Sequence, residues 1–298
     1  MTTKTSADLA NEVINLVSVE RIDEDRFVAS AAPDEHQSGA GRVYGGLVVA
    51  QALAAAEATV PADRPPGSFQ CRFLRPGNES KPIHYRVERD LDGGSFTHRR
   101  VVADQDGKPI LTCSIMFHRG ESGVAHQPQM PEVPAPKDIR AELLSRHRSG
   151  ETLSAALNAF LIEPSPIEFI PVSAEQWDPT IPSDAPVCAW LRIATPLSDD
   201  PRLHRAILAY ASDMALLQAA DVRHALSWFR GEINQPSLDH AIWFHDEVRA
   251  DEWLLYVTES PWAGRGRALT RGQMFASDGR LVASTAQEGL IRLLKPKE

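Results

Sequence analysis

The sequence is poor in cysteine and has no long run of apolar residues. Its 298 residues include three cysteines, Cys71, Cys113 and Cys188, whose odd number and wide spacing favour reduced thiols over a disulfide framework or a zinc site. No apolar run approaches the ~18–20 residues that a membrane-spanning helix needs. We therefore expect no structural disulfide, no metal centre and no insertion into a membrane.

The chain also lacks an excess of positive charge and the common targeting motifs. Its formal net charge is −9, whereas a general nucleic-acid-binding protein usually carries a basic excess, so we expect no nucleic acid as partner. Residues 1–19 have no continuous apolar core and do not match a secretory signal. The chain ends in Lys-Pro-Lys-Glu rather than in the peroxisomal Ser-Lys-Leu. A cytoplasmic location is the expectation.

Several catalytic and cofactor motifs are missing as well. The absence of G-x-S-x-G argues against the serine nucleophile of an α/β-hydrolase. There is no H-E-x-x-H, and His240 and His245 have no convincing third metal ligand. A glycine-rich stretch from Gly39 to Gly45 resembles a dinucleotide-binding loop, but its spacing is wrong and no parallel βαβ pattern surrounds it. No cofactor is expected.

What the sequence does contain is an internal repeat. Residues 71–117 resemble residues 242–290, and identical residues recur 171 positions apart in three pairs, Tyr85 and Tyr256, Glu88 and Glu259, and Arg100 and Arg271. After one inserted residue, the turn expected at Asp106-Gly107 matches Asp278-Gly279. A repeat of this size indicates two halves of one architecture. A position where the halves differ in polarity is therefore a candidate for function.

Each half is predicted to contain a buried apolar helix and an antiparallel meander, which together indicate an α+β fold whose sheets wrap the helices. The helices are expected over residues 7–19, 45–60, 138–148, 152–161 and 203–220, and the strands over 26–31, 41–44, 68–74, 82–90, 96–104, 110–119, 167–172, 187–194 and within 237–294. We divide the chain into a first unit (1–120), a proline-rich linker (121–186) and a second unit (187–298).

The second half carries polar residues where the first half is apolar. Asp213 lies in the apolar stretch AILAYASDMALLQAA, where a carboxylate is costly unless it is hydrogen-bonded and where it would suit a general base. Gln287 stands where the first half has Ile115, and an inward-facing amide can orient a water or a substrate carbonyl. Ser237 and Asp239 open the second meander as further candidates.

Each candidate also has a structural alternative. Asp213 could cap a helix irregularity or face solvent there. Gln287 could form a cross-strand hydrogen bond or lie on an exposed face. Ser237 and Asp239 could be turn residues at the entry to a strand.

In the order of its segments the chain resembles the acyl-CoA thioesterase II (TesB-like) family of double-hotdog enzymes. The matching segments are GRVYGGLVVAQALAAAEATVP (41–61), AWLRIATPLSDDPRLHRAILAYASD (189–213) and residues 73–110, 126–136, 166–172 and 237–289. The resemblance implies two fused hotdog units, each an antiparallel sheet curled around a central helix. It also implies hydrolysis of fatty acyl-CoA to free acid and coenzyme A.

The family's catalytic aspartate, serine or threonine, and glutamine fall on Asp213, Ser237 and Gln287 of this sequence. We expect these residues to hold one water, from which Asp213 removes a proton as the water attacks the thioester carbonyl. A backbone N–H near the start of the second helix is expected to stabilise the oxyanion. Ile170 and residues 193–194 and 222–234 depart from the family pattern, which leaves the preferred acyl chain length open.

Two other functions remain possible for this fold. A hotdog hydratase or dehydratase would need a His–Asp or His–Glu pair, which the first apolar helix does not offer. A non-catalytic acyl-CoA-binding protein would not need the intact trio. Exposed edges of the two sheets also favour a homo-oligomer, a dimer or a tetramer.

Overall fold

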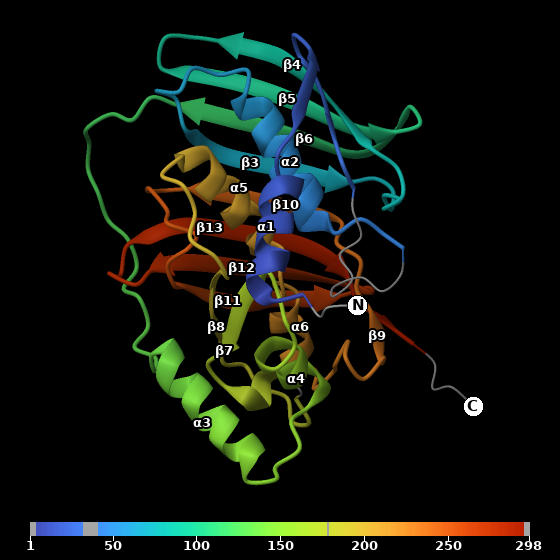
Figure 1. The fold of residues 1–298 in the computed structure, drawn as a ribbon, viewed down its shortest axis with the longest axis vertical. Coiled ribbons are helices and arrows are strands. Elements are labelled where there is room, and N and C mark those ends of the chain that lie inside the picture. The colour runs from blue at the N-terminus through green and yellow to red at the C-terminus, as the bar shows by residue number, and fades with distance from the viewer. Residues whose placement is uncertain (1–3, 32–40, 178, 295–298) are drawn as a thin grey trace.

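The computed structural model describes residues 4–31, 41–177 and 179–294; Gly39 and the C-terminal residues 295–298, considered above, lie outside these ranges. One antiparallel sheet of twelve strands dominates the molecule, with helices packed against it (Figure 1). The helices are α1 (Ser6–Leu16), α2 (Gly45–Glu57), α3 (Pro136–Arg148), α4 (Ala155–Leu161), α5 (Pro201–Ser212), α6 (Gln218–Val222) and the 3-10 helix η1 (Ala174–Trp177).

The sheet runs from the first half of the chain into the second without interruption. In spatial order its strands are β1 (Glu20–Asp23), β2 (Arg26–Ala29), β4 (Ile83–Asp92), β5 (Phe96–Gln105), β6 (Lys108–His118), β3 (Pro66–Phe73), β10 (Asp239–Phe244), β13 (Leu281–Leu290), β12 (Arg267–Ala276), β11 (Leu254–Gly264), β8 (Val187–Ile193) and β7 (Ile167–Pro171). Strands β3 and β10 join the halves, with Phe69 opposite Ile242. A separate ribbon pairs β9 (Ile233–Asn234) with β14 (Arg292–Leu293).

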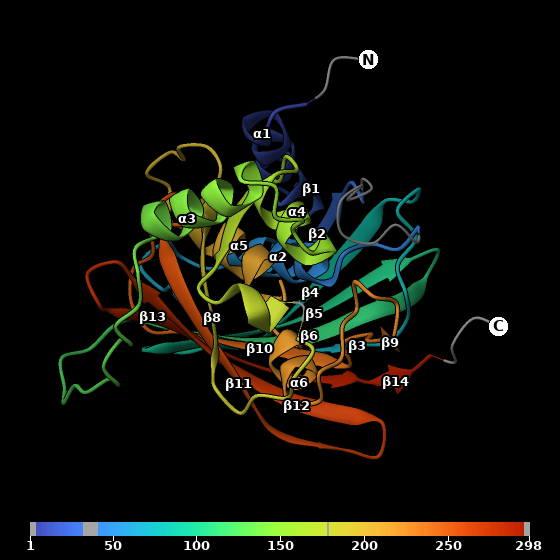
Figure 2. The same ribbon diagram turned by 90° about the horizontal axis from the view of Figure 1, so that it is seen from below.

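Helices α2 and α5 lie side by side on the concave face of the curved sheet (Figure 2). They run in opposite directions, because the start of α2 touches the end of α5 and Glu57 at the end of α2 pairs with Arg205 near the start of α5. A Cβ at Gly46 would lie 2.3 Å from the carbonyl oxygen of Tyr210, so only glycine permits this approach. The arrangement confirms the predicted α+β fold of two fused hotdog units.

The segment between the halves folds onto the outer face of the second half. Alternate residues of β8 face two cores: Ala189 and Leu191 belong to the core around α2 and α5, whereas Trp190 packs with Leu143 of α3 and Leu157 of α4. Strand β7 then pairs with β8, so the predicted linker contributes helices and a strand to the second half. Its boundaries at residues 121 and 186 stay a prediction.

The second apolar helix is shorter than expected. We predicted one helix over residues 203–220, but α5 ends at Ser212, residues 213–217 form turns and α6 follows. Ala215 has a positive φ of 56°, which a right-handed helix does not accommodate, and apolar composition alone gives no sign of such a break. The expected strand over residues 41–44 is also wrong: Arg42 forms only an isolated bridge with Asn78. No helix within the described ranges is long and apolar enough to cross a membrane.

Candidate active site

A row of four buried side chains crosses the middle of the sheet. The register of β6, β3 and β10 places Cys113 opposite Cys71 and Cys71 opposite His240, and the pairing of β10 with β13 brings His240 beside Gln287. All four side chains are at most 4% exposed. The row therefore continues from apolar thiols in the first half to hydrogen-bonding groups in the second.

Two of the three predicted catalytic residues are in direct contact. The Gln287 Nε2 donates to Ser237 Oγ at 2.8 Å, and Ser237 itself forms a β-bridge with Gly289 at the entry to β10. Asp239, the fourth candidate, accepts a hydrogen bond from the Glu288 backbone N–H at 2.7 Å. Its carboxylate is thus used to hold β10 against β13, while Ser237 and Gln287 share a site.

Asp213 lies at the end of α5, where the helix gives way to turns. As its structural alternative expected, it occupies a helix irregularity, but its Oδ1 is buried and has no hydrogen-bond partner among the described residues. Its Oδ2 faces the start of α2, where a Cβ on Gly45 would lie only 2.7 Å away. The negative end of α5 disfavours a carboxylate, whereas the positive start of α2 favours one. The carboxylate is thus placed between two opposed helix ends.

Asp213 lies at the end of α5, the apolar helix of the second half, and not near its start. We expected an oxyanion-stabilising N–H near that helix start, but α5 begins at Pro201, the end of the helix pair remote from Asp213. The start of α2 is next to Asp213 instead. Because α2 and α5 run antiparallel, the end of one meets the start of the other.

His240 is the residue of this site that the sequence analysis considered only as a metal ligand. Its Nδ1 lies 2.5 Å from Gln287 Oε1 and its Nε2 lies 2.8 Å from Ser212 Oγ. Burial lowers the pKa of the imidazole, an effect that the nearby charge of Asp213 opposes. The ring is fully buried and therefore neutral near pH 7. Comparison of the halves could have revealed it, since Phe69 occupies the matching position.

Tyr256 holds the end of α5 from the sheet side. Its hydroxyl donates to the Ser212 carbonyl oxygen at 2.8 Å and lies 2.8 Å from Thr285 Oγ1. Burial raises the pKa of the phenol well above its usual value, so it stays a donor at any physiological pH. Ser212 is thereby fixed through both its backbone and its side chain, and Asp213 follows it directly in the chain.

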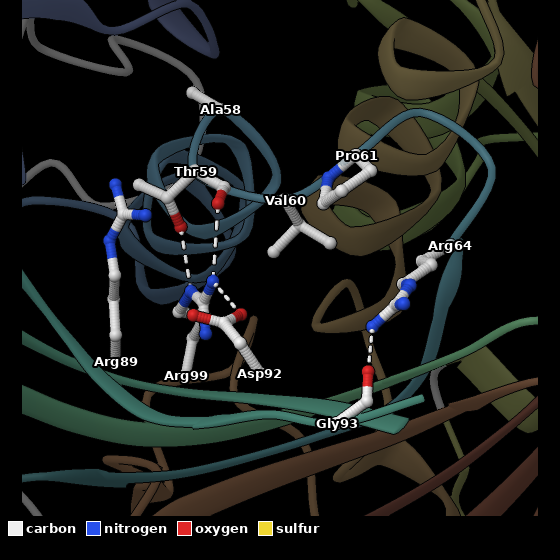
Figure 3. Close-up of a pocket in the computed structure, with 9 residues that line it drawn as sticks. All are labelled: Ala58, Thr59, Val60, Pro61, Arg64, Arg89, Asp92, Gly93 and Arg99. Atoms are coloured by element: carbon white, nitrogen blue, oxygen red, sulfur yellow. Dashed lines mark hydrogen bonds and ion pairs between the residues drawn. The ribbon is translucent and has the colours of Figure 1, made fainter. Parts of the chain in front are cut away.

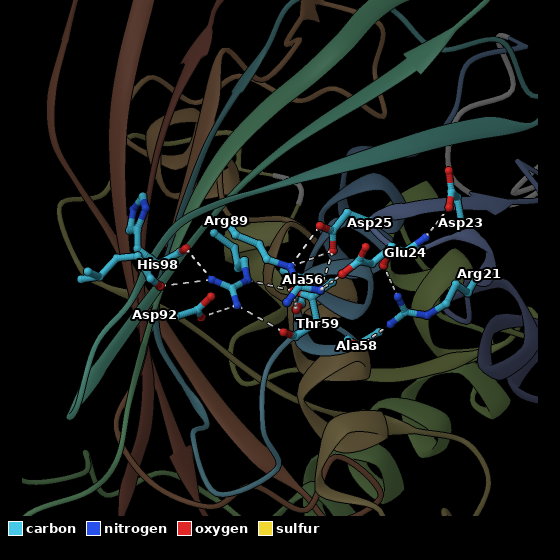
Figure 4. A network of polar contacts seen from close by, with 12 residues as sticks. Arg21, Asp23, Glu24, Asp25, Ala56, Ala58, Thr59, Arg89, Asp92 and His98 are labelled. Carbon is cyan, nitrogen blue, oxygen red and sulfur yellow. Dashed lines mark hydrogen bonds and ion pairs between the residues drawn. The ribbon is translucent and has the colours of Figure 1, made fainter.

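A surface pocket of about 510 Å³ lies at the opposite end of α2 (Figure 3). It is lined by residues 58–61, Arg64, Arg89, Asp92, Gly93 and Arg99. The buried Arg99 already donates to Thr59 Oγ1 at 2.9 Å and to Asp92 Oδ1 at 2.5 Å, and Figure 4 shows Arg89 engaged with Asp25. Arg99 thus binds β5 to the segment after α2 and Arg89 binds β4 to the turn between β1 and β2, so we assign the pocket a structural role.

No three side chains of His, Cys, Asp or Glu come together as a possible metal site in the part of the chain that the structure describes. The chemistry available around the end of α5 is that of the Asp213 carboxylate, the neutral His240 imidazole, the Gln287 amide and the hydroxyl groups bonded to them. Such a set can bind and deprotonate a water molecule next to a polarised carbonyl group.

The chain is similar to known proteins in sequence and in structure. Residues 185–290 match the family model described as acyl-CoA thioesterase, and residues 32–118 match that of the acyl-CoA thioesterase N-terminal domain. The chain is 36% identical to acyl-coenzyme A thioesterase 8 of Homo sapiens, over 96% of this chain and 90% of that protein. It is 34% identical to acyl-CoA thioesterase 2 of Haemophilus influenzae, over 96% and 99% respectively. The crystal structure of the acyl-CoA thioesterase II TesB2 of Mycobacterium marinum superposes with a TM-score of 0.75 at 34% identity, covering 96% of this chain and 99% of that one.

Proposed function

This chain belongs to the acyl-CoA thioesterase family, and from that premise we propose that it hydrolyses fatty acyl-CoA with one water that Asp213 deprotonates and that Ser237 and Gln287 orient. The observation that supports this proposal is the 2.8 Å hydrogen bond between Gln287 and Ser237, together with the buried Oδ1 of Asp213, which has no hydrogen-bond partner among the described residues. The two are linked through Ser212, which precedes Asp213, and through His240.

The water attacks the thioester carbonyl carbon while Asp213 takes its proton. Because Gln287 donates to Ser237 Oγ, the serine keeps its own proton for a further hydrogen bond. Ser237 can therefore donate to the water oxygen and fix the direction of its attack. A positioned base of this kind contributes about 10²–10⁴-fold to the rate.

The start of α2 supports the charge that develops on the carbonyl oxygen. The amides of Gly45 and Gly46 belong to the first turn of the helix, whose N–H groups have no acceptor within the helix, and Tyr44 provides no side-chain cap. These donors and the helix dipole favour an oxyanion. When the tetrahedral intermediate collapses, the C–S bond breaks and the coenzyme A thiolate leaves. A thiol pKa near ~8.5 makes a strong general acid unnecessary.

Ser237 acts on the water and not as a nucleophile. Among the described residues its hydroxyl meets the donor Nε2 of Gln287, and His240 is engaged with Gln287 and Ser212. No base therefore touches Ser237 to activate it. An acyl adduct on Ser237, trapped by rapid quenching and found by mass spectrometry, would replace the water mechanism with a covalent one.

The test is free thiol release from acyl-CoAs of different chain length by the wild type and by Asp213→Asn. We expect hydrolysis by the wild type and a fall in kcat of about 10²–10⁴-fold in the variant, with folding and ligand binding retained. Glu57→Gln is the matched control, because it neutralises a buried carboxylate at the other end of the same helix pair. It should leave kcat unchanged.

The outcomes separate the proposed function from its rivals. Wild-type protein that binds acyl-CoA and releases no thiol would be a binding protein. A change in the absorbance of an enoyl-CoA without thiol release would identify a hydratase. Thiol release that survives in Asp213→Asn would leave the activity standing and remove Asp213 as its base.

A further inference from the structure

We propose that His240 is a positioning residue of this site: as the neutral Nδ1–H tautomer it fixes the orientation of the Gln287 amide, so that Ser237 accepts a hydrogen bond from Gln287 and offers its own proton to the reacting water. The proposal deepens the proposed function and rests on it. His240 touches neither Ser237 nor the water and acts through Gln287.

The hydrogen bonds of the site depend on one another. Gln287 turns its Nε2 toward Ser237 and its Oε1 toward His240 Nδ1, and an acceptor oxygen at 2.5 Å requires a proton on that nitrogen. The neutral ring then has its lone pair on Nε2, which faces the Ser212 hydroxyl at 2.8 Å. The Ser212 hydroxyl has one proton and two acceptors within reach, this nitrogen and the Ala209 carbonyl oxygen at 2.9 Å, and in the proposed tautomer the proton points to the nitrogen.

The opposite tautomer would reverse the direction of the chain. With the proton on Nε2, Ser212 would accept from His240 and donate to Ala209, and the amide of Gln287 would have to turn over. Ser237 would then donate its hydroxyl proton to Gln287 Oε1 and could only accept a hydrogen bond from the water. The tautomer of one buried ring thus decides whether Ser237 is a donor or an acceptor in the reaction.

The first half of the molecule shows that the fold does not need this polar pair. Phe69 and Ile115 are opposite each other in the same register of β3 and β6, and both are fully buried. Their positions match those of His240 and Gln287 at offsets of 171 and 172 residues. An apolar pair therefore satisfies the packing of this architecture, and buried polar groups cost stability unless they are bonded. The second half retains them for the site.

Three substitutions separate positioning from packing. His240→Asn keeps an amide nitrogen close to the place of Nδ1, His240→Gln keeps one close to the place of Nε2, and His240→Phe copies the first half. We expect kcat to fall by about 10²-fold in the Phe and Gln variants, because a misdirected amide displaces the water, with KM little changed. His240→Asn should recover at least part of this loss. Equal kcat for the Asn and Gln variants at equal thermal stability would overturn the proposal.

A double-mutant cycle tests the route of action. If His240 acts through Gln287, His240→Phe should have almost no further effect on kcat in a Gln287→Ala background. Additive losses would mean that His240 acts independently and would remove the proposed role. His245→Asn is the control, since it breaks a 2.8 Å contact with Ser284 outside the site and should leave kcat as in the wild type.

The tautomer itself can be read by ¹⁵N NMR of protein labelled at histidine, with the His240 signals assigned by their loss in His240→Asn. We expect a protonated Nδ1 and an unprotonated Nε2. A protonated Nε2 or an imidazolium at neutral pH would contradict the proposal. Parallel assays keep the two proposals apart: if Asp213→Asn and Gln287→Ala abolish hydrolysis while His240→Phe retains wild-type kcat, only the role of His240 is wrong.

Discussion

The two halves of the molecule have the same architecture and different chemistry at matching positions of the sheet. In the first half Phe69 faces Ile115, whereas in the second half His240 faces Gln287. Both pairs are buried; the first belongs to the apolar core, whereas His240 reaches Ser212 at the end of α5. Since an apolar pair suits the packing at the matching positions of the first half, this difference is the one on which our proposals for the second half rest.

The two ends of the α2–α5 pair differ in the same way. At one end the Asp213 carboxylate faces Gly45, whose missing side chain leaves room for it. At the other end Glu57 is 4% exposed and its Oε1 receives two hydrogen bonds from Arg205, at 2.8 and 2.6 Å. Each carboxylate has one buried oxygen without a hydrogen-bond partner among the described residues, but only Glu57 is paired with a cation. The two ends of one helix pair thus place a buried carboxylate in different surroundings, beside a helix start at one end and beside a guanidinium group at the other.

Exchanging the residues at matching positions of the two halves tests this difference most directly. Gln287→Ile copies the first half and removes both the contact to Ser237 and the acceptor of His240, so we expect kcat for thiol release to fall by about 10³-fold. Ile115→Gln introduces an unpartnered amide opposite Phe69 in the apolar core and should lower the free energy of unfolding by about 1–3 kcal/mol. Its kcat per folded molecule should match the wild type; a large loss there would show that the first half takes part in catalysis.

Removing the cation at the other helix end should cost stability and not activity. Arg205→Met leaves the buried carboxylate of Glu57 without its partner, which we expect to lower the free energy of unfolding at pH 8 by roughly 3 kcal/mol. Urea unfolding measures this loss. Arg202→Met provides the control on the same helix, because Arg202 donates to the Val60 carbonyl oxygen at 3.4 Å and acts on Glu57 through its charge without hydrogen-bonding to it. Similar losses in both variants would refute the special role of the ion pair.

The same carboxylate gives the stability a dependence on pH. Burial raises the pKa of Glu57 from 4.5 to about 7, although Arg205 opposes the shift. Between these values the folded protein holds a proton that the unfolded chain has lost, so the free energy of unfolding decreases as pH rises and levels off above about 7. The contribution is about 2–3 kcal/mol. Unfolding of wild type and Glu57→Gln between pH 4.5 and 8 should differ by this slope, and parallel curves would contradict it.

The smallest expected difference concerns two tyrosines that the repeat places at equivalent positions. Tyr85 donates to Gln51 Oε1 within α2, and Tyr256 donates to the Ser212 carbonyl oxygen beside the site. Replacing either by phenylalanine should lower the free energy of unfolding by about 1 kcal/mol. Only Tyr256→Phe should also lower kcat, several-fold, because it loosens the residue that precedes Asp213. Equal kcat in both variants would mean that α5 is held without this bond.

Local patterns were sufficient for most of the secondary structure. The apolar run before Pro61 predicted α2, and the turn expected at Asp106-Gly107 has the positive φ values, 52° and 72°, of a tight hairpin turn. The break after Ser212 was missed because alanine and leucine continue on both sides of it. A composition that suits a helix does not reveal that one residue, Ala215, adopts a left-handed conformation.

The sequence pointed to some residues of the candidate site and not to others. Comparing the halves drew attention to Asp213 and Gln287 from the sequence, because a polar residue in an apolar stretch is visible one position at a time. Their catalytic roles stay a prediction. His240 was not recognised as part of the site, since its importance lies in contacts with Ser212 and Gln287 rather than in its own neighbours along the chain.

The internal repeat, the buried helices, the alternating strands and the residue types available for chemistry could be predicted from the sequence. The contact of Asp213 with the start of α2 rather than that of α5, and the place of His240 between Ser212 and Gln287, could be seen only in the folded chain. The physical reason is that helices and strands follow from short-range periodicity, whereas these contacts join residues distant in the chain. They are set by strand register and by the antiparallel packing of two helices, which no local pattern records.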